Sequence, residues 1–140
     1  SANFCPEFCQ PDYAFFTNSK RFEKLDLAAL PCPVVLTSNL RPLPQGALAV
    51  NYDRLAAPDV QNASLGSNSV LMLLRLLRLC GANAVLLAGA DGYKSGTPAY
   101  ADSLLHAHTG RGAAFNTAMA GAIKACGLDV TFITPSEYAK

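Results

Sequence analysis

The segment LLRLCGANAVLLAGADGYKSG, Leu76 to Gly96, decides the predicted fold of this 140-residue chain. It opens on the apolar end of a helical pattern, which stops at Gly81. The residues from Asn83 to Asp91 then carry no charge before the aspartate, as expected of a parallel strand covered on both faces. A strand that ends on an acidic residue between glycines leads into the crevice where open parallel sheets bind ligands.

Strand and helix patterns alternate on both sides of this segment. Short β-branched or aromatic runs bounded by Pro, Asn, Ser or Gly predict further strands at Tyr13–Thr17, Pro33–Asn39, Ala47–Tyr52 and Leu128–Thr134. Apolar residues at helical spacing predict helices over residues 18–30, 67–81 and 111–127.

Strands that alternate with helices pair in parallel through right-handed crossovers. The predicted fold class is therefore α/β, a three-layer α/β/α sandwich with a mostly parallel, Rossmann-like sheet of about five strands. Residues 1–12 are predicted to be an N-terminal extension, and residues 13–140 a single domain, since a chain of this length suits one core.

Composition narrows the class of partner. The formal net charge is +1, and charged residues make up 15% of the chain, against about 25% in average proteins. No basic stripe is present, so neither nucleic acid nor an anionic membrane surface is an expected partner. The longest apolar run, Val70–Cys80, is interrupted by Arg75 and Arg78 and is about half the ~20 residues that a membrane span needs.

The cysteines favour a reduced protein. Their number is odd, and none of them shows the C-x2-C spacing of a zinc site. Two interpretations of Cys5 and Cys9 stay open: either they form a disulfide or bind a metal ion together, or they are ordinary thiols. The expected location is the cytoplasm, because disulfides are rare there and no signal peptide is evident.

Polar residues follow four predicted strands. Since the carboxyl ends of parallel strands meet at one edge of a sheet, they are the candidate ligand-binding residues. The strongest candidate is Asp91, which would bind a ribose hydroxyl, a sugar hydroxyl or an amine; the alternative is an Asp-Gly turn whose side chain serves the loop. The other candidates at this edge are Ser38, Asn39, Asn51, Tyr93 and, at the start of a helix, Asn116.

Asn68 and Ser69 open the most apolar helix. Backbone N–H groups at a helix start bind phosphate or carboxylate, and an ordinary Ser/Asn cap is the alternative. His106 and His108 are two residues apart, which does not place both rings on one helical face, so no metal site is predicted. The nucleophile motif G-x-S-x-G is absent, and no catalytic residue or cofactor is assigned.

The stretches VVLTSNL, AVNYDRL, GSNSVLMLLRLLRLCGANAVLLAGADGY and VTFITPSEY together resemble a known family. They are similar to the C-terminal Rossmann-like region of bacterial HMGL-like (4-hydroxy-2-oxovalerate) aldolases, which are often linked to surface-polysaccharide biosynthesis. The resemblance covers roughly Tyr13 to Tyr138. In that family the lyase chemistry belongs to an N-terminal TIM barrel with metal-binding histidines, which this sequence does not contain. The resemblance therefore implies an accessory domain whose partner is the barrel of a parent chain.

The same helix, strand and G-x-D pattern is more distantly similar to MptE-like pterin pyrophosphokinases and to sialyltransferases that bind CMP-sugars. That similarity implies nucleotide-proximal roles for Asn68, Ser69, Asp91 and Tyr93. Three functions are thus open: a regulatory domain that binds a small polar or nucleotide-like metabolite, a transferase that uses a nucleotide-activated sugar or pyrophosphate donor, and a structural module that forms homo-oligomers.

Overall fold

The computed structural model describes residues 1–3, 10–26, 29–56, 63–94 and 112–140. The chain divides into two compact units, Ser1–Leu73 and Leu74–Lys140, which we call unit 1 and unit 2. The predicted single domain over residues 13–140 stays a prediction. Among the helices in the described parts of the chain, none has the length and apolar character that crossing a bilayer requires.

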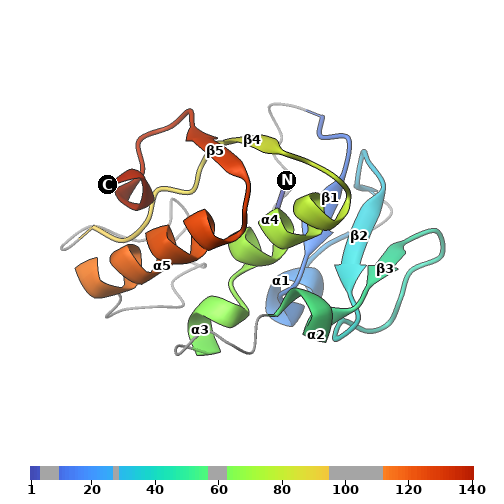
Figure 1. The fold of residues 1–140 in the computed structure, drawn as a ribbon. Helices are drawn as coiled ribbons and strands as arrows, with labels where there is room; N and C mark the ends of the chain where they lie inside the picture. The colour runs from blue at the N-terminus through green and yellow to red at the C-terminus, as the bar shows by residue number, and fades with distance from the viewer. Residues whose placement is uncertain (4–9, 27–28, 57–62, 95–111) are drawn as a thin grey trace. The chain divides into compact units, whose positions relative to one another are not determined.

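Unit 1 contains a parallel three-stranded sheet of order β1-β2-β3 (Figure 1). The strands are β1 (Ala14–Phe16), β2 (Val34–Thr37) and β3 (Leu48–Val50). Phe16 lies opposite Leu36, and Thr37 lies opposite Val50. All three strands therefore end at the same edge of the sheet, and the residues that follow them are brought together there.

Short helices follow two of these strands. α1 (Ser19–Phe22) comes directly after β1 and is capped by Asn18, whose side chain accepts a hydrogen bond from Arg21 N. α2 (Tyr52–Leu55) follows β3 and is capped in the same way by Asn51. Both helices begin at the carboxyl edge of the sheet because the chain leaves each strand straight into its cap.

Two further helices follow α2 along the chain. α3 (Ala63–Gly66) was not predicted, because the polar residues of this stretch were interpreted as the start of the next helix. α4 (Ser69–Leu79) was predicted, and the division between the units falls within it. Its first turn is capped by Asn68, and Gly81, with a φ of 91°, follows its end. Only glycine adopts that backbone conformation without strain, which explains the stop.

The core of unit 1 is centred on β1. The residues of β1 are almost completely inaccessible to solvent. Side chains from β1, α1, β2 and the turn after β2 pack together in one cluster. The members of the cluster are Ala14, Phe16, Phe22, Leu36 and Leu40. Each buried Phe or Leu contributes about 1.5–3 kcal/mol to folding, so this cluster anchors the strand ends that carry the polar residues.

Unit 2 contains a parallel pair of strands, β4 (Ala84–Leu87) and β5 (Asp129–Phe132). They are joined through α5 (Ala113–Ala125), which buries Phe115, Met119 and Ile123 on one face and contacts β5 (Figure 1). A short 3-10 helix, Glu137–Ala139, follows β5 and packs on α5.

The structure confirms mixed α/β architecture with parallel strands. Each of the five predicted strands is present, shortened by one to four residues at its ends. The helix predicted over residues 18–30 is wrong at the described residues 23–26, because α1 ends at Phe22. Leu25 nevertheless packs against the core cluster of unit 1, so the apolar spacing that suggested a helix is satisfied by a turn.

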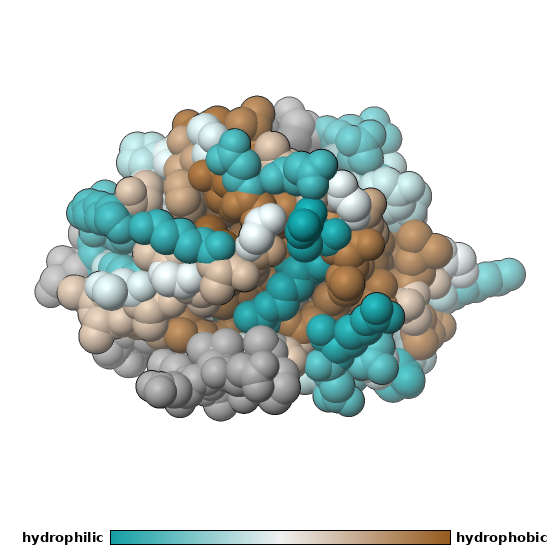
Figure 2. Space-filling view, viewed as in Figure 1, coloured by the Kyte–Doolittle hydropathy of each residue, from teal (hydrophilic) through white to brown (hydrophobic). Residues whose placement is uncertain are grey.

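The strand β4 also differs from the prediction that both of its faces are covered. Val85 and Leu87 are half-buried, whereas Leu86 is 71% exposed. Ile133, directly after β5, is 61% exposed. Figure 2 shows apolar surface in brown between polar regions. Among the described residues, the large apolar side chains that are exposed are Tyr13, Leu43, Leu48, Leu79, Leu86 and Ile133.

Candidate functional site

The carboxyl edge of the sheet in unit 1 gathers three predicted site residues, Ser38, Asn39 and Asn51, all exposed. Ser38 Oγ accepts a hydrogen bond from Tyr52 N at 3.0 Å, and Asn51 Oδ1 accepts one from Arg54 N at 3.2 Å. Residues 37 and 50 are in register, so the residues that follow them lie at the same edge of the sheet. The hydrogen bonds fix the positions of the Ser38 and Asn51 side chains there.

Two buried threonines form hydrogen bonds at this edge of the sheet. Thr37 is 1% exposed, and its hydroxyl donates to Phe16 O at 3.3 Å. Thr17, also buried, accepts at its carbonyl oxygen a hydrogen bond from Asn39 Nδ2 at 3.2 Å. Both threonines lie within predicted strands, and sequence reasoning did not identify Thr17 as part of the site. Its position as the last residue of the apolar run YAFFT was the available signal.

Asn68 and Ser69 stand at the start of α4. Asn68 Oδ1 accepts from Val70 N at 2.9 Å and from Leu71 N at 3.4 Å, so the side chain occupies amides of the first turn. This is the geometry of an N-cap. The predicted binding of an anion by these amides stays a prediction.

The loop after β4 in unit 2, Gly89 to Tyr93, is held at successive peptide groups. Gly89 N donates to Thr134 Oγ1 at 2.9 Å, and Ser136 Oγ donates to Ala90 O. Glu137 N donates to Asp91 O at 2.8 Å. Polar side chains and backbone that follow β5 thus bind the loop that follows β4, as expected where two parallel strands end together.

Asn116, predicted to contact a ligand, binds this loop. Its Nδ2 donates to Tyr93 O at 2.8 Å, and its Oδ1 accepts from Tyr93 N at 3.0 Å. Asn116 is 6% exposed, and the neighbouring Phe115 packs edge-to-face on Tyr93 with ring centroids 5.3 Å apart. α5 therefore clamps both the backbone and the ring of Tyr93.

Gly92 lets the loop approach its neighbours closely. Its φ is 82°, and a Cβ placed there would lie 2.8 Å from Glu137 Cβ and 3.3 Å from Asn116 Oδ1. Glycine is required for both the backbone conformation and the space. Asp91, the residue before it, is exposed. The clamped loop therefore presents a carboxylate to solvent from a well-defined backbone.

The charges around this loop include a pair that sequence reasoning did not single out. Lys140 Nζ donates to Glu137 Oε2. This hydrogen bond lowers the pKa of Glu137 below its usual range, and the positive charges of Lys140 and Lys94 act in the same direction. The Glu137–Lys140 pair lies close to the loop that carries Asp91, since Glu137 N donates to Asp91 O.

The predicted site residues fall into groups. Ser38, Asn39 and Asn51 lie together in unit 1, and Asp91, Tyr93 and Asn116 lie together in unit 2. Among the residues that the structure describes, no three His, Cys, Asp or Glu side chains are placed to hold a metal ion. His106, His108, Cys5 and Cys9 lie outside the described residues.

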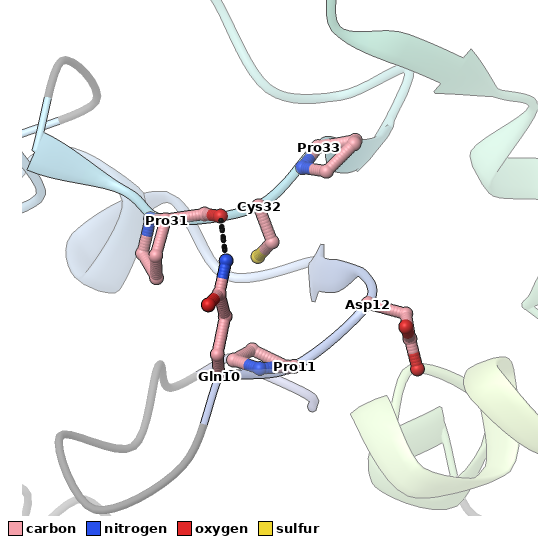
Figure 3. A pocket seen from close by; sticks show the side chains of 6 residues that line it. All are labelled: Gln10, Pro11, Asp12, Pro31, Cys32 and Pro33. Atoms are coloured by element: carbon pink, nitrogen blue, oxygen red, sulfur yellow. Dashed lines mark hydrogen bonds between the residues drawn. The ribbon is translucent and has the colours of Figure 1, made fainter.

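A pocket of about 400 Å³ opens at the amino edge of the sheet in unit 1 (Figure 3). Gln10 Nε2 donates across it to Pro31 O at 3.0 Å. The lining contains one ionisable carboxylate and none of the predicted site residues. It consists of the residues before β1 and β2, namely Gln10, Pro11, Asp12, Pro31, Cys32 and Pro33.

Comparison of the chain with family models, with curated proteins and with solved structures found no match. The candidate site therefore rests on the geometry of this chain's own residues.

Proposed function

We propose that this chain is an accessory α/β domain of a larger aldolase-type protein and that it binds a small polar or nucleotide-like metabolite at the carboxyl ends of its parallel strands. No catalytic role is assigned to its residues. The proposal follows the general location of ligand sites in open parallel α/β sheets. The family assignment rests on the sequence resemblance alone.

One observation carries the proposal, the clamped loop from Gly89 to Tyr93. Backbone groups at four of its five positions are bound by residues from α5 and from the segment after β5. A site that is already rigid loses little conformational entropy when a ligand binds. Asp91 stands exposed on this loop, so its carboxylate is the proposed contact.

The chemistry of the exposed side chains limits the class of ligand. Ser38, Asn39 and Asn51 offer uncharged donors and acceptors in unit 1, whereas Asp91 offers a carboxylate in unit 2. Carboxylates accept hydrogen bonds from hydroxyl and amino groups. Sugars, nucleosides and amino-bearing metabolites meet this requirement.

A thermal-shift screen of the whole chain against CTP, CMP, nucleotide sugars and 2-oxo acids tests the proposal. A ligand at a hundred times its dissociation constant adds about 2.7 kcal/mol to stability. Asp91→Ala should abolish the shift caused by a binding compound. Asp129→Ala is the matched control, because Asp129 is also exposed in unit 2 but stands at the amino end of β5. No shift with any compound, or equal shifts in both variants, counts against the proposed site.

A structural module that forms homo-oligomers is the second candidate. Leu86 and Ile133 favour it, because strand alternation places both on one face of the β4–β5 pair and both are largely exposed. Light scattering tests it: a dimer in the wild type that dissociates in Leu86→Ser, together with silence in the ligand screen, would favour this function over ligand binding.

We also propose the finer architecture expected from the sequence, a single mostly parallel sheet of about five strands in a three-layer sandwich. The parallel direction of every described strand pair supports it. An experimentally determined structure with two separate sheets would overturn it.

A further inference from the structure

β1 has the burial of an interior strand. Its three residues are buried, and among the described residues β2 is the only named strand that pairs with it. Its other side is covered by residues Ser1–Asn3, which we call the edge strap. Ala2 forms a parallel bridge with Phe15. Phe15 N donates to Ser1 O at 2.9 Å, and Asn3 N donates to Phe15 O at 2.7 Å. The strap thus satisfies both backbone groups of a buried residue, which would be costly to leave unpaired.

Asn3 ends the strap with a second set of contacts. Its φ of 53° lies in the left-handed region, which asparagine tolerates better than most residues. In this conformation its side chain reaches Thr17: Oδ1 accepts from Thr17 N at 2.9 Å, and Nδ2 donates to Thr17 Oγ1 at 3.3 Å. Asn3 therefore binds the backbone and the hydroxyl of the residue that follows β1.

Thr17 connects the strap with the candidate site. Its N–H and hydroxyl are bound by Asn3, and its carbonyl oxygen is bound by Asn39 Nδ2 at 3.2 Å. Thr17 is buried, whereas Asn39 is exposed at the carboxyl edge. One continuous hydrogen-bonded path thus runs from the strap through a buried residue to a side chain at the candidate site.

We propose that the edge strap is a positioning device for the carboxyl edge of unit 1, in which Asn3 holds Thr17 and Thr17 holds Asn39. Asn3 is a positioning residue, since it acts on Asn39 only through Thr17. Release of the strap removes the partners of Phe15 and loosens Thr17, so the Asn39 amide loses its defined orientation. The consequence for a ligand rests on the proposed function, but the mechanical coupling does not.

Amide hydrogen exchange by NMR on the full chain tests the coupling. In Asn3→Ala, exchange at Thr17 N–H should accelerate roughly fivefold or more, because a hydrogen bond is lost and the new residue is strained at positive φ. The side-chain NH2 signals of Asn39 should shift. Exchange at Ala56 N–H, which donates to Tyr52 O in α2, is the reference for unit 1. Asn3→Asp keeps an acceptor oxygen for Thr17 N–H and should retain its protection.

Three results would overturn the proposal: unchanged exchange at Thr17 in Asn3→Ala, equal acceleration at Thr17 and Ala56, or Asn39 NH2 signals that do not move. Asn3→Gly separates the two contributions, since glycine accepts the backbone conformation but lacks the amide, and Thr17 should still lose protection. These readouts need no ligand. Failure of the ligand screen would therefore leave the result for the strap intact.

Discussion

Asn116 binds Tyr93 with both ends of its side-chain amide, donating to the carbonyl oxygen at 2.8 Å and accepting from the N–H at 3.0 Å. One side chain on α5 thereby binds both backbone groups of Tyr93, in the loop after β4. The same contact explains why an asparagine is buried at this position of an otherwise alanine-rich helix.

Loss of this clamp should destabilise unit 2. Asn116→Ala removes both of these hydrogen bonds to Tyr93, which should cost about 1–3 kcal/mol. Urea denaturation followed by circular dichroism measures the change. Thr117→Ala, at the adjacent exposed position of α5, should change stability by no more than about 0.5 kcal/mol. Similar losses in both variants would show that the clamp contributes nothing specific.

Two glycines of unit 2 should respond in opposite directions to alanine. Gly92→Ala forces a side chain into positive φ and against Glu137 Cβ, and should cost more than about 1 kcal/mol. Gly121→Ala lies in the interior of α5 with open space around it, and should add about 0.5–1 kcal/mol. Denaturation midpoints of the two variants provide the comparison. A neutral Gly92→Ala would mean that the loop adopts another conformation in solution.

The titration of Glu137 should depend on Lys140. Lys140→Ala removes the hydrogen bond that lowers the pKa of Glu137, so the NMR titration midpoint of its carboxyl carbon should move up towards the usual value. Lys94→Ala should produce a smaller upward shift, because Lys94 acts through its charge alone. An unchanged midpoint in Lys140→Ala would contradict the pair.

The sign of the associated stability effect follows from linkage. The folded pKa of Glu137 lies below its unfolded value, so the contribution of the pair is present above the unfolded pKa and disappears as the pH falls through the folded pKa. The effect should be small and sensitive to salt, since the Lys140 side chain is 72% exposed.

The two cysteines of unit 2 that the structure describes should react at different rates. Cys80 is exposed, whereas burial raises the pKa of the Cys126 thiol, and the charge of Arg75 offsets only part of that effect. Because the thiolate is the reactive form, iodoacetamide near pH 8 should modify Cys80 first. Peptide mass spectrometry identifies the sites. Arg75→Ala should slow the modification of Cys126 further, and equal rates at both cysteines would contradict the burial of Cys126.

Long, strongly patterned elements could be predicted from the sequence. The apolar body of α4, with Asn68 before it and Gly81 after it, needs no knowledge of its surroundings, and the face of α5 that carries Phe115, Met119 and Ile123 follows from helical spacing. α1 was predicted too long because the apolar spacing continues to Leu25. A helix is marginal without a long run of backbone hydrogen bonds, and here the chain reaches the core through a turn instead.

The candidate site could be predicted only as a location. Parallel strands with polar ends indicated that Ser38, Asn39 and Asn51 would lie at one edge of the sheet, and the register of β2 and β3 places them there. The role of each amide was not predictable, because an asparagine can cap a helix, clamp a loop or face solvent with the same local sequence around it. Asn3 carried no sequence signal at all, since the partner of its side chain, Thr17, is 14 residues away in the chain.

The sequence by itself determined the positions of the five strands and of α4 and α5, the parallel direction of the strands and the polar character of their carboxyl ends, because hydrophobic period and turn residues act over a few neighbouring positions. The tertiary structure alone decided that Asn116 holds Tyr93, that Asn3 holds Thr17 and that Asp91 is exposed on the loop after β4. The physical reason is that a hydrogen bond depends on which donor and acceptor meet in space. That meeting is settled by packing between segments 14 and 23 residues apart.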